Sequence, residues 1–176
     1  MKRWLRWIGA AIALQAVAIG VYFASAPSPE TDGDRAFHAI APQAWSQLDP
    51  QLMGQAGTVA PRQGRPALLH FWATWCAPCR DELPRVLALA SSLPELDVWC
   101  VTTDAKWETV RGYFHGQVPA AVVHDVGGTL ARRLGVSELP DSYLVDRFGR
   151  VHARSLGTRR WDAAALRAEL LAEGRP

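Results

Sequence analysis

The sequence predicts a mixed α/β sandwich, in which a central mixed sheet is flanked by helices, with a transmembrane helix at the N-terminus. Short apolar runs typical of buried strands alternate with segments of helical periodicity, which is the pattern of a parallel core sheet. A closing pair of strands adds antiparallel neighbours. The 176 residues suffice for one domain, and 49% apolar with 20% charged residues is a globular composition.

The N-terminal segment is predicted to be a membrane anchor. Lys2, Arg3 and Arg6 precede an apolar run over residues 7–24, which as a helix would be about 27 Å long, close to the hydrocarbon thickness of a bilayer. The basic residues favour a cytoplasmic N-terminus. A cleaved signal peptide is the alternative, because Ala24-Ser25-Ala26 has the form of a cleavage site. Both interpretations send the rest of the chain out of the cytoplasm.

The chain therefore divides into three parts. Residues 1–26 are the anchor or signal peptide, residues 27–44 a linker, and residues 45–176 the folded domain. The linker is predicted because Pro, Gly and Asp residues interrupt any periodicity there. Without the three N-terminal cations, 16 basic residues remain against 17 acidic ones, and such a near-neutral body excludes the electrostatic footprint of a nucleic-acid-binding protein.

Each element of the domain is predicted from a local pattern. Residues 67–72 form a nearly continuous apolar run, typical of a strand buried on both faces. Helical spacing follows at Leu83, Val86, Leu87 and Ala90. The later elements are a strand over 97–101, a helix from Trp107 to Phe114 capped by Asp104, a strand over 120–123, a short helix opened by Gly127-Gly128, a hairpin of strands 143–145 and 151–153, and a helix over 161–173. A weak signal indicates one more hairpin within 45–63.

A cysteine pair lies between the first buried strand and the first helix. Cys76 would be at the helix N-terminus, where free N–H groups stabilise a thiolate and lower the thiol pKa. Cys79 is three residues further along the same helical face, where it can attack a mixed disulfide formed at Cys76. The alternatives are a zinc clip, which would need two more ligands nearby, and a structural disulfide, which stabilises little across so short a loop.

The segment 71–79, FWATWCAPC, resembles the active-site segment of the thioredoxin superfamily, and more narrowly that of the TlpA/ResA/DsbE-like thiol:disulfide oxidoreductases of bacterial envelopes. Residues 135–140 and 143–149 resemble the cis-proline loop of this family and the strand after it. The resemblance covers roughly residues 45–173. It implies a thioredoxin-like sandwich with a redox-active disulfide, Cys76–Cys79, and neither a further cofactor nor a metal.

The same resemblance implies further site residues. Pro140 would follow a cis peptide bond and face the cysteine pair, and the Leu139 backbone would pair with a substrate peptide. Glu82 matches an acidic residue that ResA-like proteins place near the site, where it would raise thiol pKa values or move a proton. A solvated helix face is the alternative for Glu82. The surface that meets substrate would comprise Trp75, Ala77, Pro78 and Leu139.

His70 departs from the family pattern, because thioredoxin has a buried acid and many TlpA-like chains an amide at this strand position. An imidazole here would either accept the Cys79 proton near neutral pH or be a hydrogen-bonded core residue. Cys100, in the second strand, is expected to be a small buried residue without a redox role. Trp72 is expected to belong to the core or the floor of the site.

These observations predict a thiol:disulfide oxidoreductase held in the bacterial inner membrane by residues 7–24, with its catalytic domain in the periplasm. It would reduce disulfides of envelope proteins, as in cytochrome c maturation, and receive electrons from a membrane donor. An oxidant or isomerase with the same site is one alternative, and a copper-binding module with Cys76, Cys79 and His70 as ligands is another. A peroxidase is disfavoured because Ala73 replaces the threonine expected three residues before the attacking cysteine.

Overall fold

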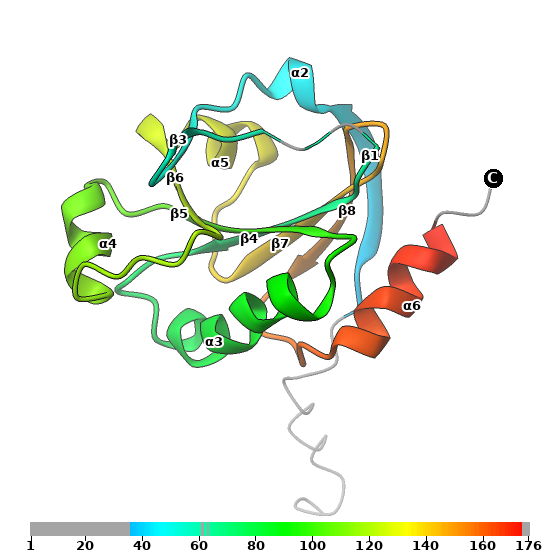
Figure 1. Cartoon of the computed structure of the whole chain (residues 1–176). Coiled ribbons are helices and arrows are strands. Elements are labelled where there is room, and N and C mark those ends of the chain that lie inside the picture. The colour runs from blue at the N-terminus through cyan, green and yellow to red at the C-terminus, as the bar shows by residue number, and fades with distance from the viewer. Residues whose placement is uncertain (1–35, 61, 63, 174–176) are drawn as a thin grey trace, which may run out of the picture. The chain divides into compact units, whose positions relative to one another are not determined.

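The structure, a computed structural model, describes residues 36–60, 62 and 64–173. Within these residues one mixed sheet has helices on both faces, which confirms the predicted sandwich (Figure 1). The strands, in their order across the sheet, are β1 (His38–Ala44), β8 (Arg150–Leu156), β7 (Asp141–Val145), β4 (Ala67–Trp72), β5 (Asp97–Thr102), β6 (Val122–Asp125), β2 (Leu52–Gly54) and β3 (Gly57–Thr58).

The centre of the sheet follows the predicted alternation of strands and helices. β4 pairs in parallel with β5, and β5 with β6. β7 and β8 form the predicted hairpin, and β7 runs antiparallel to β4. β6 begins two residues later than predicted, because the Val122 N–H donates to the Pro119 carbonyl in a turn before the strand.

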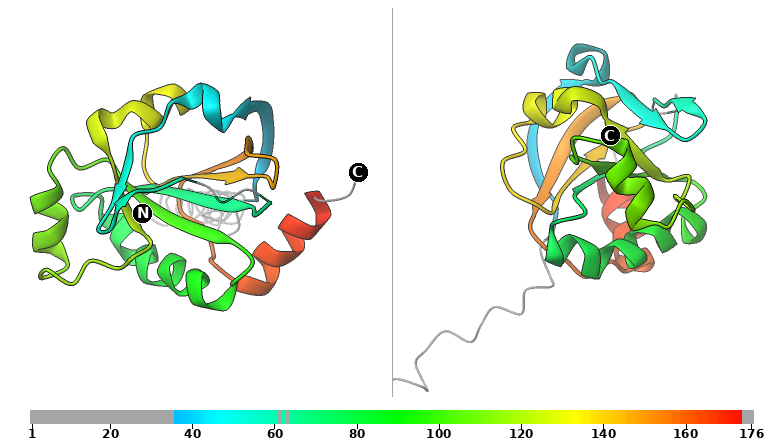
Figure 2. Two further views of the ribbon diagram at one scale, coloured as in Figure 1. Left: turned by 45° about the horizontal axis from the view of Figure 1, so that its top comes forward. Right: turned by 90° about the vertical axis from the view of Figure 1, so that its left-hand side faces the viewer.

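Two long helices cover one face of the sheet, and two short helices cover the other. Two helices, α3 (Ala77–Ser92) and α6 (Ala163–Glu173), lie on one face, and α2 (Trp45–Leu48) and α5 (Thr129–Leu134) lie on the other (Figures 1 and 2). α4 (Trp107–Tyr113) lies beyond the β5 and β6 strands, and a 3₁₀ turn, η1 (Val126–Gly128), leads into α5. α6 begins two residues after the predicted start, because the Asp162 carboxylate caps it by accepting the Ala165 N–H.

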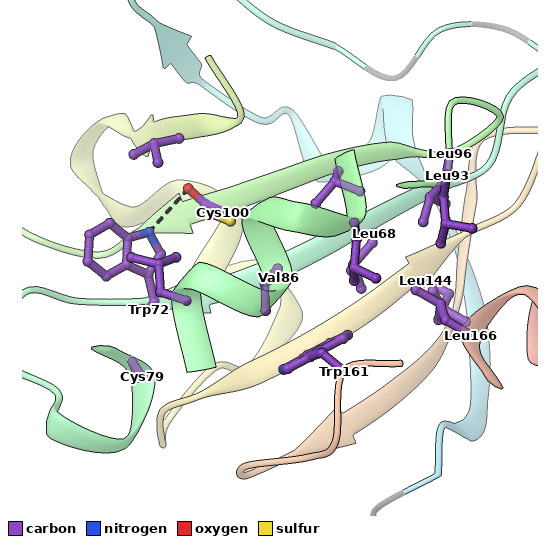
Figure 3. Packing of buried hydrophobic residues seen from close by; sticks show 14 of the residues in the cluster. Leu68, Trp72, Cys79, Val86, Leu93, Leu96, Cys100, Leu144, Trp161 and Leu166 are labelled. Carbon is purple, nitrogen blue, oxygen red and sulfur yellow. Dashed lines mark hydrogen bonds between the residues drawn. The ribbon is translucent and has the colours of Figure 1, made fainter. Parts of the chain in front are cut away.

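Two apolar cores result from the alternation of side chains along β4. Leu68 and Trp72 point to the α3 side, where they pack with Val86 and Leu144 (Figure 3). On the opposite face, Leu69 and Phe71 belong to the core beneath α2 and α5. All six residues of β4 are buried, as the apolar run predicts.

The predicted linker ends earlier than expected. Residues 38–44, assigned to it from the sequence, instead form β1, an edge strand that pairs antiparallel with β8. Most β1 side chains are exposed, and only Ile40 among the described β1 residues packs against the core beneath α2 and α5. Backbone pairing with β8 therefore supplies much of what holds this strand. The edge position also tolerates Pro42. The weak hairpin signal within 45–63 is confirmed by β2 and β3.

The predicted anchor, residues 7–24, lies outside the described residues. Among the residues that are described, no helix is both long and apolar enough to cross a membrane. Gly174, the predicted end of the last helix, also lies outside them.

Candidate active site

The two cysteines lie at the N-terminus of α3, directly after the loop that leaves β4. Cys76 is the N-cap residue of α3 and forms a disulfide with Cys79, whose backbone N–H lies 3.3 Å from the Cys76 Sγ. Cys76 retains 5% of its surface and Cys79 none. A substrate therefore meets the Cys76 sulfur first, and Cys79 is reached only through it.

A buried carboxylate, that of Asp104, holds the loop before Cys76. Its oxygens accept the Thr74 backbone N–H at 2.9 Å, the Thr74 hydroxyl at 2.7 Å and the Thr102 hydroxyl at 2.7 Å. The prediction that Asp104 caps the helix at Trp107 is wrong, because the N-cap of α4 is Lys106 and makes no side-chain hydrogen bond. Asp104 instead ties the active-site loop to the end of β5.

Pro140 lies at the same sheet edge as the cysteine loop. The Leu139–Pro140 peptide bond is cis, as the resemblance implies, and Pro140 is buried. Phe71 is paired with Asp141, so Pro140 is level with the last residue of β4, from which the cysteine loop emerges. Leu139 is half-buried.

Three of the four residues predicted to meet substrate are exposed beside the cysteines. Trp75 is 71% exposed, and Ala77 and Pro78 are exposed in the first turn of α3. Trp72 is fully buried and donates its indole N–H to the Cys100 carbonyl at 3.2 Å. Trp72 therefore belongs to the core, whereas Trp75 presents a large apolar side chain to solvent next to Cys76 in the sequence.

Glu82 is buried one turn after Cys79, with 3% of its surface exposed, so the solvated-face alternative is wrong. Its Oε2 accepts the Arg159 backbone N–H at 3.1 Å. Burial raises the pKa of Glu82 to about 7, against smaller lowering effects of the Arg159 N–H, the Trp161 side chain and the charges of Arg159 and Arg85. The carboxyl group can thus gain and lose a proton near neutral pH.

His70 is fully buried on β4, with its Nε2 3.5 Å from Glu82 Oε1 and its Nδ1 3.0 Å from Ser142 Oγ. Burial lowers the pKa of His70 to about 3. The imidazole is therefore neutral at neutral pH and does not take a proton there, contrary to the first sequence-based interpretation. The second interpretation, a hydrogen-bonded core histidine, fits the geometry.

Cys100 is fully buried on β5, next to His70 in the parallel register, as expected of a core cysteine. Burial, together with the nearby Glu82 charge, raises the pKa of its thiol well above its ordinary value. Across the described part of the chain, no three His, Cys, Asp or Glu side chains are grouped so that they could hold a metal ion.

Sequence reasoning missed three residues beside the buried polar groups: Ser142 at His70, and Arg159 and Trp161 at Glu82. It also missed that Asp104 holds the cysteine loop. Thr74 and Asp104 are 30 positions apart, and Glu82 and Arg159 are 77 apart. No local pattern links residues so distant, and only the strand register brings them together.

Replacement of Asp104 by alanine should destabilise the domain and loosen the cysteine loop. The variant leaves the N–H of the half-buried Thr74 without its acceptor, and hydrogen bonds to charged groups contribute about 1.5–3 kcal/mol each. We expect a loss of about 2–4 kcal/mol in the free energy of unfolding, measured by urea titration. Asp81→Ala, which removes an exposed carboxylate from α3, is the matched control and should change stability by less than about 0.5 kcal/mol. Equal effects of the two substitutions would contradict the assignment.

Comparison with known proteins places the chain in a family. The AhpC/TSA family model matches residues 44–154. ResA, a thiol-disulfide oxidoreductase of Bacillus thuringiensis, is 35% identical over 95 residues, which cover 51% of this chain and 53% of ResA. A DsbE homologue of Paracoccus denitrificans, named a thiol:disulfide interchange protein, is 34% identical over 63% of this chain and 57% of its own length. The chain thus spans just over half the length of these relatives.

Solved structures share the fold. A Chlorobium tepidum protein assigned as a thiol:disulfide interchange protein DsbE is 32% identical, with a TM-score of 0.59 over 80% of this chain and 96% of that one. StoA of Bacillus subtilis, at 22% identity, has the same fold, with a TM-score of 0.57 over 69% of this chain and 98% of StoA. The fold is therefore thioredoxin-like, and the chain belongs to the AhpC/TSA family, among the relatives of ResA, DsbE and StoA.

Proposed function

We propose that this protein is a thiol:disulfide oxidoreductase that exchanges disulfides with other proteins through Cys76 and Cys79. The observation that carries this proposal is the unequal placement of the two sulfurs. Cys76 caps α3 at the protein surface, and Cys79 is sealed beneath it. This is the arrangement that an attacking and a resolving thiol require.

In the reducing direction, the Cys76 thiolate attacks a substrate disulfide and releases one substrate sulfur as a thiolate. The N–H groups at the start of α3 stabilise the Cys76 thiolate before the attack. The Cys79 thiol then loses its proton and attacks the Cys76 sulfur, which releases the second substrate sulfur and re-forms the Cys76–Cys79 disulfide. The pair loses two electrons and the substrate gains them.

Glu82 is the base that we assign to the resolving step. It lies three residues after Cys79 on α3, and side chains at that spacing are about 5–6 Å apart at their Cβ atoms. Its pKa of about 7 allows it to take the Cys79 proton and then release it. The cis Pro140, level with the end of β4, and the half-buried Leu139 would position an extended substrate next to Cys76.

We further propose that the protein is a reductant of envelope protein disulfides, with the cysteine pairs of apocytochromes c as candidate substrates. The catalytic domain would face the periplasm, residues 7–24 would cross the inner membrane, and a membrane donor would re-reduce the cysteines. The apolar run behind three basic residues supports the location, and the family resemblance supports the substrate class.

Replacement of Cys79 by serine should trap the substrate on Cys76, because the resolving thiol is missing. When reduced Cys79→Ser is mixed with a disulfide-bonded test protein such as insulin, a mixed disulfide should accumulate on non-reducing gels and in the intact mass. Cys76→Ser should form no adduct. Cys100→Ala should behave as the unmodified protein, since Cys100 is buried. An adduct that forms without Cys76 would refute the assigned order of attack.

The reduction potential of the Cys76–Cys79 pair decides the direction of exchange. For a fragment lacking residues 1–26, equilibrated with dithiothreitol or glutathione, we expect a value near or below about −250 mV, which is in the range of reductants. A value between about −180 and −120 mV belongs to an isomerase or oxidant and would exclude the reducing role.

The anchor predicts that the full chain stays in the membrane fraction of a bacterial cell after an alkaline carbonate wash. Removal of residues 1–26 should transfer the protein to the soluble fraction. If the full chain instead yields a soluble product whose first residue is Pro27, residues 1–26 are a cleaved signal peptide.

A further inference from the structure

A line of three polar side chains crosses the otherwise apolar core between the sheet and α3. Ser142 on β7 and His70 on β4 are paired in the antiparallel register, and Glu82 reaches His70 from α3. The distances are 3.0 Å from Ser142 Oγ to His70 Nδ1 and 3.5 Å from His70 Nε2 to Glu82 Oε1. All three side chains are at least nine-tenths buried, so none of them relies on bulk water.

The neutral imidazole can serve both protonation states of the carboxyl group. When Glu82 is ionised, His70 with its proton on Nε2 donates toward Oε1, and the Ser142 hydroxyl donates to Nδ1. When Glu82 is protonated, its O–H donates to Nε2, and His70 with its proton on Nδ1 donates to Ser142 Oγ. Neither state leaves a buried donor facing another donor.

Neither Arg159 nor Arg85 replaces His70 as the partner of the Glu82 Oε1 atom. The Arg159 backbone N–H binds the second carboxylate oxygen, Oε2, whereas the Arg159 guanidinium pairs with Glu169 at 2.9 Å and lies over the Trp161 ring. Arg85, from α3, contributes only its charge. Oε1 has no hydrogen bond of ordinary length to a described residue, and neither does His70 Nε2. The two atoms face each other at 3.5 Å, and the Trp161 side chain is a further donor near Glu82 that lowers its pKa.

Among the described residues, Trp161 and Cys100 also lie next to His70, and neither is a proton acceptor. Trp161 meets the imidazole edge-on, with the ring centroids 5.4 Å apart. Cys100 is the neighbour of His70 on β5, and its thiol stays protonated because burial and the Glu82 charge raise its pKa. Cys79 approaches from α3, on the helical turn before Glu82.

We propose that His70 is a positioning residue for the resolving step, whose tautomer switches with the protonation of Glu82 and is held in each state by Ser142. The proposal rests on the exchange activity proposed above. In the step it serves, the Cys79 S–H bond breaks and the proton goes to Glu82. The Cys79–Cys76 bond forms with the electron pair of the Cys79 sulfur, and the substrate sulfur leaves Cys76 as a thiolate.

The first test reads the tautomer directly in the intact, oxidised protein. ¹⁵N chemical shifts of the His70 imidazole should report mainly the Nδ1–H form near pH 5.5 and mainly the Nε2–H form near pH 8.5. In Glu82→Gln, whose side chain does not titrate, the tautomer should not change with pH. One unchanged tautomer at both pH values in the unmodified protein, or a doubly protonated ring at pH 5.5, would overturn the proposal.

The second test separates the two chemical steps by kinetics. Reduced protein reacts with 5,5′-dithiobis(2-nitrobenzoate) at Cys76 in a phase that depends on reagent concentration, and Cys79 then expels the second chromophore in a phase that does not. The rate of this second phase should rise with pH through an inflection near 7. The inflection should be absent in Glu82→Gln.

His70→Leu removes a donor to the ionised carboxylate, and such charge-assisted bonds are stronger than neutral ones. The inflection should therefore move up by about one pH unit, which slows the second phase about fivefold at pH 7. His70→Asn, whose amide can donate or accept, should restore part of the rate, and the first phase should change in neither variant.

An unshifted inflection in His70→Leu would reduce His70 to a packing residue. An inflection that His70→Leu abolishes and Glu82→Gln retains would make His70 the base.

The failure of the exchange activity itself would look different. In that case the unmodified protein would release no second chromophore at any pH, whereas its ¹⁵N shifts would still show whether the His70 tautomer follows Glu82.

Discussion

Strand β4 is buried on both faces, and the register it keeps with β5 and β7 sets the geometry of the whole site. A one-residue slip would turn His70 away from α3 and exchange the β4 side chains between the two apolar cores. Because β4 ends where α3 begins, the same register brings Cys76 to a helix N-terminus beside the cis Pro140. The two apolar cores therefore hold the site residues in position as well as stabilising the fold.

The residues around β4 are buried, and this burial moves the pKa values of Glu82 and His70 in opposite directions. Desolvation disfavours charge, so it raises the pKa of Glu82 to about 7 and lowers that of His70 to about 3. The carboxyl group therefore carries the mobile proton, and the imidazole remains a neutral hydrogen-bonding partner. Histidine is usually associated with proton transfer near neutral pH, but His70 is suited to orienting the Glu82 carboxyl group instead.

Several features were predictable because they depend on neighbouring residues. The apolar run of β4, the helical stripe of α3 and the Cys76–Cys79 spacing were all correctly interpreted. The errors occurred where distant partners decide the outcome. β1 looked like a linker because its partner, β8, supplies its hydrogen bonds. Asp104 looked like a helix cap because Thr74, its actual partner, is 30 residues away.

The sequence by itself determined the fold class, the cysteine pair and its position between a strand and a helix, because periodicity and short spacing act within one or two elements. Only the tertiary structure decided which side chains are buried and which groups contact each other across the sheet. Burial and strand register both depend on contacts between residues that are far apart in the sequence. Burial fixes the pKa values of Glu82 and His70, and the register brings His70 against Ser142. The identity of the proton-carrying group was therefore beyond the reach of any local pattern.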